Sequence, residues 1–550
     1  MPQSNSRFPR LSISAAAGAV LACIFFFFLG RAFVPHLGIQ NDEALFGAAI
    51  YQQSGLASWR WVFGHRVPLM LMSYLGGLKC WIFWLVFQFW TPGAASVRVP
   101  VLVAGAATVW LFFVLLKRIS TARAALAGAV LLAADTSFLL TTCFDWGPVA
   151  LQHLLLTGGV LLVVIFVQTR SWPSLAGGFF LFGLGVWDKA LFCWALGGLS
   201  AATLAVYPRE AWRLFSFRRA GVATAAFAVG ALPLLIYNLN PQHRLETFRG
   251  NASWSAEDVP GKARLLRQAL EGSALFDWLV AEDTPGAAPM APRTALARAS
   301  AWLSAAAGQP RRSLLAWGFA AALVLFAWLW RRQGWKGSVR VLAFTLVFLA
   351  VTWLEMALTK GAGGGLHHTV LLWPAPHLFI ALALAGAAAG LRRGGVALGA
   401  AVAVLAGSSL LVTNQYYVFM MRNGGGINWT DAVYPLAGFV RQLPAHNVFV
   451  IDWGMLDTLQ LLARGKVPLR VGSDPVSKPA LDAADREVVW NWVSDPANVF
   501  VGHTEGNEFF PGARRHLLET AAGFGFRSEM LQVVRDRRGQ PIFEVFRFAR

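Results

Sequence analysis

The chain has 550 residues, of which 56% are hydrophobic and only 14% are charged. A soluble globular protein of this length would carry more charge and shorter apolar runs, so this composition excludes that class for most of the chain. The net charge of +19 lies entirely in residues 1–423, largely in short loops between apolar runs, and no basic face is interleaved with aromatics, which excludes nucleic-acid binding.

The apolar runs predict a polytopic α-helical membrane protein. The first run, residues 11–30, is too long for the apolar core of a signal peptide and no small-x-small cleavage site follows it, so we expect a retained helix. The later runs are long enough to cross a bilayer, or nearly so. We predict eleven spans, at residues 11–34, 97–116, 124–143, 147–168, 173–187, 190–206, 220–238, 313–330, 339–358, 369–390 and 395–413.

Charge in the loops predicts the orientation. With the N-terminus in the cytoplasm, the inside loops hold sixteen cations against a single acid, Glu210. Because cytoplasmic loops are enriched in Lys and Arg, we expect a multi-pass protein of the cytoplasmic (inner) membrane with its C-terminal segment outside the cytoplasm. The cations are Arg7, Arg10, Lys117, Arg118, Arg123, Arg170, Arg209, Arg213, Arg218, Arg219, Arg331, Arg332, Lys336, Arg340, Arg392 and Arg393.

The Trp- and Phe-rich stretch at residues 68–90 is also long enough to span, but a span there would reverse every later loop and violate the charge rule. We therefore expect it to lie in the outer interface as helices broken at Gly76–Gly77 and Lys79. Aromatic side chains suit that depth.

This topology places four segments and the tail on the outer face. We expect residues 1–423 to form the membrane module and residues 424–550 to form a small extracytoplasmic α/β domain. The outer segments of the module are the loops 35–96, 239–312 and 359–368 and the turn at Asp145. In the tail, residues 447–453, 498–504 and 541–548 are typical of strands, and residues 514–526 of a helix ending at glycine.

Two adjacent acids, Asp42 and Glu43, open a short helix directly after the first span. Asn41 could cap this helix, and carboxylates are favoured at a helix N-terminus, so a capped helix start would explain one acid without any catalysis. Two acids are more than a cap needs, and ionisable residues at bilayer depth are usually functional. Both interpretations stay open at this point.

The other candidate residues also have structural alternatives. Asp145, before Gly-Pro, could simply cap the next helix, and Asp188–Lys189 could be an ion pair that joins two helices. Adjacent histidines cannot easily face one metal, so no cofactor is certain for His367–His368, although a divalent metal is possible. The cations on the outer side, including this pair, are Arg66, Lys189, Arg244, Arg249, Lys360, His367 and His368.

A carboxylate that faces several cations at a membrane surface fits one chemistry. A general base takes a proton from an acceptor, and Arg or Lys holds and neutralises a departing phosphate. A lipid phosphate would require such a site to lie at the interface, and no nucleotide-binding motif is seen in the chain.

The order of the motifs resembles the GT-C superfamily of membrane glycosyltransferases, in particular the lipid A aminoarabinose transferases, the protein O-mannosyltransferases and the transferases of rhizobial lipopolysaccharide core. The resemblance covers about residues 1–390 and rests on the motifs NDEALFGAAI, HRVP, SVRVPVL, FDWGP, GLGVWDK and TKGAGGGLHHTVLLWPAP, in that order. Asp188 and Ala190 depart from the Thr and Gly that usually flank the lysine of the family's TKG stretch, at Lys189.

The resemblance implies a glycosyltransferase that moves a sugar from a polyprenyl-phosphate donor to an extracytoplasmic lipid, glycan or protein, with inversion. It implies that Asp42 is the general base, with Glu43 as its partner and Asp145 in the second acidic loop. Arg66, Lys189, Arg249 and Lys360 would contact the lipid phosphate, with His367 and His368 nearby. The alternative, a transporter or flippase of a lipid-linked or polar substrate, would place charges at the midplane and repeat its spans in two halves.

Overall fold

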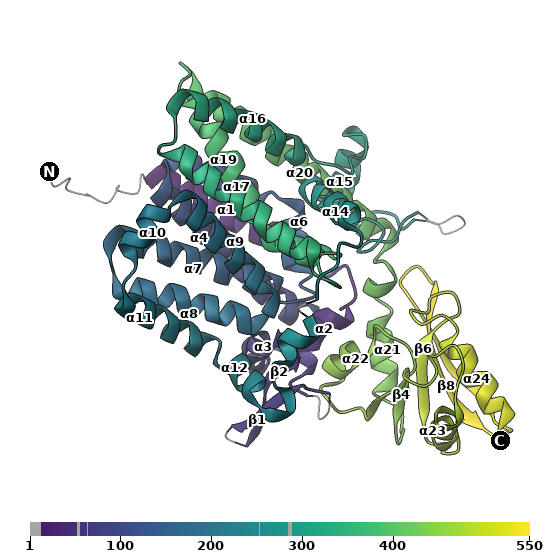
Figure 1. Cartoon of the computed structure of the whole chain (residues 1–550). Helices are drawn as coiled ribbons and strands as arrows, with labels where there is room; N and C mark the ends of the chain where they lie inside the picture. Colours follow the sequence, from purple (N-terminus) through teal and green to yellow (C-terminus); the bar gives the residue numbers. More distant parts are fainter. Residues whose placement is uncertain (1–12, 52–54, 63, 252, 284–288) are drawn as a thin grey trace.

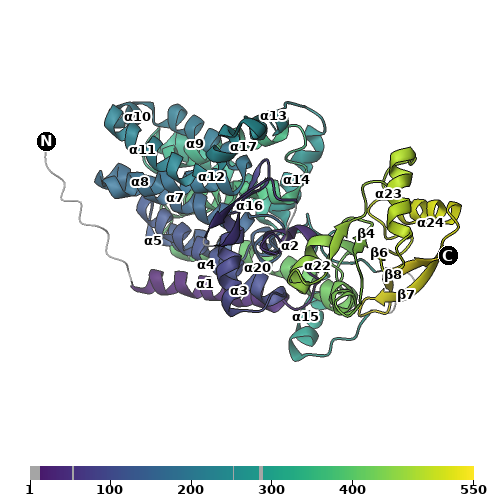
Figure 2. The same ribbon diagram turned by 90° about the horizontal axis from the view of Figure 1, so that it is seen from below.

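The computed structural model describes residues 13–51, 55–62, 64–251, 253–283 and 289–550. A bundle of long helices forms one part of the molecule, and a smaller α/β domain sits at one end of it (Figures 1 and 2). Arg7 and Arg10, two of the predicted inner-loop cations, lie outside the described residues.

The described residues contain seven helices long and apolar enough to cross a membrane, or ten spans if each of three bent pairs counts as one. They match ten of the eleven predicted spans, and α8 (Trp172–Asp188), with 17 residues, is the remaining one. The single spans are α1 (Ile13–Phe33), α4 (Ala94–Ile119), α7 (Val149–Thr169), α16 (Leu315–Gln333), α17 (Ser338–Leu358), α18 to α19 (Leu366–Thr369, η3 Val370–Leu372 and Ala375–Ala388) and α20 (Gly394–Asn423).

The bends in the first and third of these helix pairs have local causes. Asp135 interrupts the first pair because its carboxylate accepts the Phe138 N–H at 2.6 Å and starts a new helix. In the third pair Pro233 lies in the first turn of the second helix, where its ring prevents the preceding helix from continuing. The pairs are α5 (Ala122–Ala133) with α6 (Thr136–Cys143), η1 and α9 (Ala190–Phe192 and Cys193–Val206) with α10 (Pro208–Leu214), and α11 (Phe217–Gly230) with α12 (Leu232–Leu239).

The helix α8 packs along α7 and α11. Its crossing with α11 is made by two glycines: a Cβ on Gly183 would lie 2.2 Å from the Phe227 carbonyl oxygen, and a Cβ on Gly230 would lie 2.3 Å from the Phe180 carbonyl oxygen. Small residues let membrane helices approach until their backbones touch. The two glycines therefore allow α8, although it has only 17 residues, to pack closely against α11.

The stretch 68–90 is part sheet and part helix. The prediction of helices is wrong for residues 68–76, which form most of β2 (His65–Met72) and β3 (Leu75–Gly76) in an antiparallel sheet with β1 (Ser58–Val62). It is correct for the apolar helix α3 (Leu78–Phe89), but the helix break predicted at Lys79 is wrong, because Lys79 lies in the first turn of α3. Gly76 and Gly77 do not merely break a helix, because a Cβ on Gly76 would lie 2.0 Å from the Trp187 carbonyl oxygen; glycine allows the sheet to touch the end of α8.

The C-terminal α/β domain is present as predicted. Its sheet has the order β5-β4-β6-β8-β7, with the first three strands parallel and the last two antiparallel. Helices α22, α23 and α24 connect the strands. The elements are β4 (Val448–Val450), β5 (Leu469–Val471), β6 (Val499–His503), β7 (Arg527–Arg535), β8 (Pro541–Ala549), α21 (Val433–Val440), α22 (Leu456–Ala463), α23 (Ala483–Val493) and α24 (Ala513–Gly523).

This domain is fastened to the bundle through the segment after α1. The Gly38 N–H donates to the Trp429 carbonyl oxygen at 2.9 Å, and the Tyr434 hydroxyl donates to the Leu37 carbonyl oxygen at 3.1 Å. A second set of contacts involves Arg537 of the domain. It forms an ion pair with Asp431 at 3.3 Å and donates a hydrogen bond to the Met420 carbonyl oxygen in the last turn of α20. These contacts place α2 (Asn41–Ala48) between the bundle and the domain (Figures 1 and 2).

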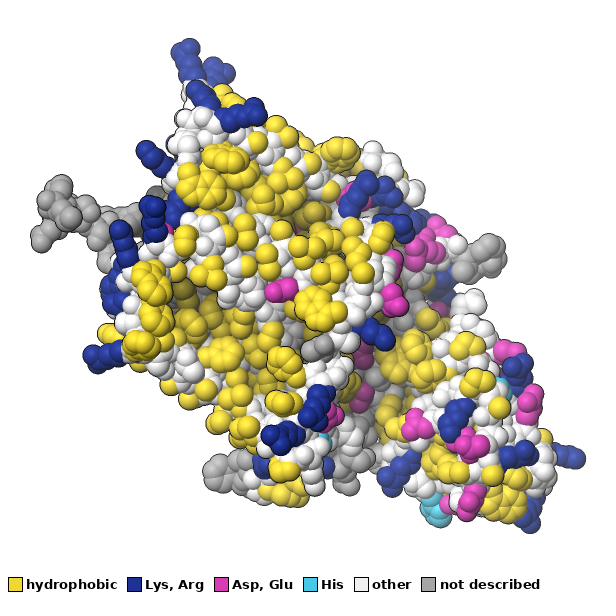
Figure 3. Space-filling model, in the orientation of Figure 1, with side chains coloured by type: hydrophobic (Ala, Val, Ile, Leu, Met, Phe, Trp, Pro, Cys, Tyr) yellow, Lys and Arg dark blue, Asp and Glu magenta, His cyan; other side chains and the backbone are white. Residues whose placement is uncertain are grey.

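Charges on the visible face are distributed unevenly. Lys and Arg side chains gather along the edge of the bundle that lies opposite the C-terminal domain, near α10 and α16, while the middle of the bundle surface is apolar (Figures 1 and 3). The helices α13 (Glu246–Asn251), α14 (Val259–Glu271) and α15 (Ala295–Ala306), from the long predicted outer loop, lie toward the end that carries the domain (Figures 1 and 2). A bilayer around the apolar middle would thus separate the basic edge from α2.

Candidate active site

The helix α2 begins with a reciprocal cap. Gln40, rather than the predicted Asn41, is the N-cap: its side-chain oxygen accepts the N–H groups of Asp42 and Glu43 at 2.7 and 3.1 Å. Glu43 accepts the Gln40 N–H in return at 3.3 Å. This capping box satisfies donors that a helix start leaves free, so the acids are not needed as N-caps.

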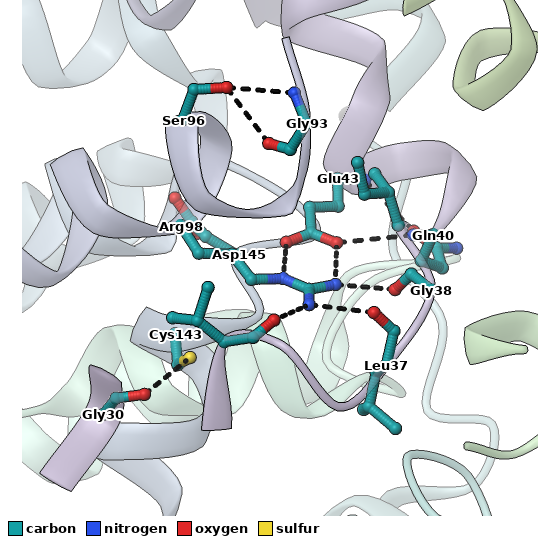
Figure 4. Close-up of polar contacts among 12 residues, drawn as sticks. Gly30, Leu37, Gly38, Gln40, Glu43, Gly93, Ser96, Arg98, Cys143 and Asp145 are labelled. Atoms are coloured by element: carbon teal, nitrogen blue, oxygen red, sulfur yellow. Dashed lines mark hydrogen bonds and ion pairs between the residues drawn. The ribbon is translucent and has the colours of Figure 1, made fainter. Parts of the chain in front are cut away.

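Glu43 is fully buried in a two-point ion pair with Arg98 of α4, with nitrogen–oxygen distances of 2.7 and 2.8 Å (Figure 4). The same guanidinium donates to the carbonyl oxygens of Val34, Leu37 and Gly38 at 2.6 to 3.1 Å. Arg98 therefore holds the whole turn that leads from α1 into α2. With both oxygens engaged, Glu43 positions α2, and this geometry favours a structural role for it over a catalytic one.

Asp42 is half-buried on the neighbouring position of α2. Burial raises the pKa of its carboxyl group, and the hydrogen bond from Gln40 and the charge of Lys189 oppose that rise. The charge of Asp42 in turn acts on Tyr74, whose carbonyl oxygen accepts the Ala190 N–H at 2.9 Å. The charges of Asp42 and Lys189 thus act on one another, and the turn between β2 and β3 contacts the chain directly after Lys189.

Lys189 lies in the break between α8 and η1, where its own backbone is extended, with φ −153° and ψ 121°. Its side chain is buried, and burial lowers its pKa to about 8 against the raising effect of Asp188, Asp145 and Asp42. Among the described residues no hydrogen bond or ion pair within 4.0 Å engages its ammonium group. A buried cation with free donors can accept an anionic ligand.

His367 and His368 share a small cavity with Lys189, which also contacts Gln152 and Trp194. Their rings are 4.1 Å apart; the Nδ1 of His367 accepts the Trp146 indole N–H at 3.0 Å, and the Nδ1 of His368 accepts the Gly363 N–H at 3.3 Å. A neutral ring that accepts at Nδ1 carries its proton at Nε2 and can donate from there. The cavity has a volume of about 10 Å³, which holds one water.

Asp145 is buried and fully engaged. One carboxylate oxygen accepts the N–H groups of Val149 and Ala150 at the start of α7, and the other pairs with Lys79 of α3 at 2.8 Å. Lys79 also donates to the carbonyl oxygens of Asp145 and Gly147. The structure therefore favours the helix-capping interpretation of Asp145. The Lys79–Asp145 pair acts on Lys189 through its charges, without a hydrogen bond or ion pair to it.

The remaining predicted cations lie at the periphery. The guanidinium of Arg66 stacks on Trp59, with its carbon 4.0 Å from the ring centre. Arg249 and Lys360 are exposed, and the backbone of their segments pairs: the Lys360 N–H donates to Ser253 and the Ser255 N–H donates to Leu358, both at 2.8 Å. The structure brings Lys189, His367 and His368 to one cavity, whereas Arg66, Arg249 and Lys360 do not line it.

Four residues around the site were given no role by the sequence analysis. Arg98 and Lys79 hold Glu43 and Asp145, Gln152 donates to Asp188 at 3.0 Å, and Asp457 of α22 is hydrogen-bonded to Asn41. Their partners are 36 to 416 positions away in the chain, so no local spacing reveals them. A buried cation inside an apolar stretch, as at positions 79 and 98, was the only signal available.

No set of three or more His, Cys, Asp or Glu side chains suited to a metal ion occurs in the described part of the chain. His367 and His368 both present Nδ1 to protein donors, as described above.

Comparison with known proteins identifies the fold. No protein-family model matches the chain, and no curated protein matches it significantly. Among solved structures it is similar to ArnT from Cupriavidus metallidurans, bound to undecaprenyl phosphate, with a TM-score of 0.56, 13% identity and coverage of 96% of this chain and 97% of ArnT. It is also similar to the Archaeoglobus fulgidus oligosaccharyltransferase, with a TM-score of 0.50, 13% identity and coverage of 88% and 68%.

These similarities extend over nearly the whole chain in the case of ArnT, and they show that the chain has the GT-C fold. The prediction of fold class, a multi-pass helical membrane protein with a small C-terminal α/β domain, is thereby confirmed.

Proposed function

We propose that this chain, which has the GT-C fold, is a membrane glycosyltransferase that moves a sugar from a polyprenyl-phosphate donor to an acceptor outside the cytoplasm. The observation that carries the proposal is a half-buried carboxylate, Asp42, that feels the charge of a buried and unengaged ammonium, Lys189, at the end of the bundle that carries the C-terminal domain. The undecaprenyl phosphate bound to ArnT, a protein of the same fold, supports a lipid phosphate as the donor's carrier.

The reaction needs one base and one phosphate site. Asp42 takes the proton of the acceptor hydroxyl or amine, and the freed electron pair forms the new bond to the anomeric carbon of the sugar. The bond from that carbon to the phosphate oxygen breaks on the opposite face, which inverts the anomeric centre. The electron pair leaves with the lipid phosphate, whose added negative charge Lys189 neutralises with the Nε2–H donors of His367 and His368.

The cavity beside Lys189 is smaller than a phosphate, so binding must widen it. The segment directly before His367 and His368 contains Gly361 and Gly363, both at positive φ, where glycine costs no strain. We propose that this segment moves outward to admit the donor and that the exposed Arg249 and Lys360 beside it meet the incoming phosphate. Arg66, stacked on Trp59, would contact the donor from the hairpin side.

The basic edge opposite the C-terminal domain supports an orientation with that edge in the cytoplasm. We propose that the protein lies in the inner membrane, with α2 and the C-terminal domain on the far side. The domain would then meet a lipid, glycan or protein acceptor there.

A direct test incubates the purified protein in lipid nanodiscs with a panel of radiolabelled polyprenyl-phosphate sugars and candidate acceptors. We expect release of free polyprenyl phosphate together with labelled acceptor for one donor class. A transporter or flippase would instead move a fluorescent lipid-linked substrate across a liposome membrane and leave the donor bond intact. That result would overturn the proposal.

Replacement of Lys189 by Gln is expected to lower kcat by about a hundredfold, since one charged donor to the departing group is lost. The melting temperature should stay close to that of the native protein, because Lys189 makes no hydrogen bond to a described residue. Steady-state kinetics with the active donor measure the effect. Exchange of the exposed Lys336 for Gln, in the turn between α16 and α17, is the matched control, and an equal loss in both variants would contradict a special role for Lys189.

The pH dependence of kcat/KM is expected to be bell-shaped. Activity rises as Asp42 loses its proton, and because its pKa is raised this limb lies above pH 3.8, the ordinary value for an aspartate. Activity falls again near pH 8 as the buried Lys189 loses its charge. The Lys189→Gln variant should lack the alkaline limb; if the limb persists in that variant, Lys189 is not its source.

A further inference from the structure

The C-terminal domain contributes a carboxylate to the surroundings of Asp42. Asp457, in the first turn of α22, accepts the side-chain N–H of Asn41 at 3.0 Å, and its own backbone N–H donates to the Asn41 side-chain oxygen at 2.9 Å. This two-point clamp joins residues 416 positions apart. Asn41 is the residue directly before Asp42, so the clamp acts on the first turn of the helix that carries the proposed base.

Asp457 is nearly inaccessible, with 8% of its surface exposed. On α2 the groups that face it are Asn41, which stabilises its charged form, and Asp42, whose negative charge opposes that form. Asp42 itself also faces the cation Lys189 and the phenol of Tyr74. The carboxylates of Asp42 and Asp457 therefore act on one another, and the charge of Lys189 acts on Asp42.

A carboxylate is not required to dock the domain here. The same helix already holds the segment with neutral groups: the Thr458 hydroxyl donates to the Ile39 carbonyl oxygen at 3.1 Å, and the Gln460 amide donates to the Tyr51 carbonyl oxygen at 3.1 Å. An asparagine at 457 could accept the same bond from Asn41. Placing a second buried acid beside the first costs stability, which indicates that its charge has a use.

We propose that Asp457 is a positioning residue for Asp42: it clamps the start of α2 through Asn41, and its charge strengthens Asp42 as a base. This inference deepens the proposed glycosyltransferase reaction and rests on it. When Asp457 is ionised, its negative charge makes Asp42 hold a proton more strongly, so Asp42 takes the acceptor proton more effectively. When Asp457 is protonated, only the clamp is left.

Kinetics of Asp457→Asn test the electrostatic part, since this change keeps the shape and the clamp. Burial, followed by the charge of Asp42, raises the pKa of Asp457 to about 7. We expect the ratio of native to variant kcat/KM to be near one well below pH 7 and to rise to about two- to fivefold above it. Asp457→Ala, which also removes the clamp, should lose about tenfold in kcat at every pH in addition.

Gln460→Ala is the matched control, because it removes a contact between α22 and the segment that follows α2 without removing a charge. Its activity relative to the native protein should not vary with pH. If Asp457→Asn shows the same flat ratio as Gln460→Ala, Asp457 merely docks the domain and the proposal is overturned.

A second readout is independent of sugar transfer. Because Asp457 binds its proton more tightly in the folded protein, its stability contribution falls as the pH rises from about 4 to about 7. The melting temperature of Asp457→Asn should therefore increasingly exceed that of the native protein over this range, and the gap should narrow in the Asp42→Asn background. If this difference in melting temperature is the same in the native and Asp42→Asn backgrounds, the two acids are not coupled and the inference is refuted. Absence of donor cleavage by the native protein would refute only the proposed reaction.

Discussion

Asp42→Asn is expected to abolish sugar transfer, with a loss in kcat of about 10³-fold or more, because the amide cannot accept the acceptor's proton. Folding should be unaffected. The cap of α2 is made by Gln40, the neighbouring ion pair by Glu43 and Arg98, and neither uses the Asp42 side chain as an acceptor for the helix start. Replacing a carboxylate that burial disfavours with a neutral amide should leave the melting temperature unchanged or raise it slightly.

The measurement is release of polyprenyl phosphate by the variant and the native protein at equal concentration, alongside thermal unfolding in the same detergent. Glu257→Gln is the matched control: this exposed acid lies in the long loop between α13 and α14. Near-native turnover by Asp42→Asn with a native-like melt would show that another group is the base. Loss of activity together with a lowered melting temperature would indicate misfolding. In that case the Asp42→Ser variant is measured instead, and loss of activity with a native-like melting temperature in that variant would support Asp42 as the base.

The membrane part of the fold could be predicted because bilayer thickness dictates long apolar runs. The sequence analysis placed eleven spans, and the structure has helices at each of these positions. It could not predict where a span bends, since the bends at Asp135 and Pro233 depend on a cap and on helix packing as well as on apolar length. The strands β2 and β3 were misassigned because PLMLMSYLGG is apolar without a clear period, and its strand form depends on contact with Trp187.

The site could be predicted only in part, for a similar reason. Order along the chain pointed to Asp42, Lys189 and the histidine pair, and the structure gathers these residues at one end of the bundle. The resemblance implied that Asp42 is the base and Glu43 its partner, but local sequence could not reveal the physical difference between these adjacent acids, because it comes from Arg98, 55 positions beyond Glu43. Likewise the tail was expected to form a small α/β domain, but no local sequence pattern indicates its contact with α2 through Asp457.

Arg98→Met is expected to give the largest loss of stability of any single substitution discussed here. It leaves Glu43 as a buried carboxylate without its ion pair and frees three backbone carbonyl groups of the α1–α2 turn. Removing one partner of a buried pair costs about 3–5 kcal/mol. The turn would lose its hold on α2, so activity should fall with stability even though Arg98 touches no reacting atom.

Thermal unfolding in a mild detergent, with the yield of monodisperse protein, measures this loss. The double variant Glu43→Gln with Arg98→Met provides the internal comparison, because it removes both charges and leaves no isolated ion inside the protein. It should recover a substantial part of the melting temperature lost by Arg98→Met alone. Equal melting temperatures for the single and double variants would mean that the ion pair does not stabilise the protein and that the hydrogen bonds of Arg98 to the backbone hold the turn. A native-like melting temperature for Arg98→Met would contradict both roles of Arg98.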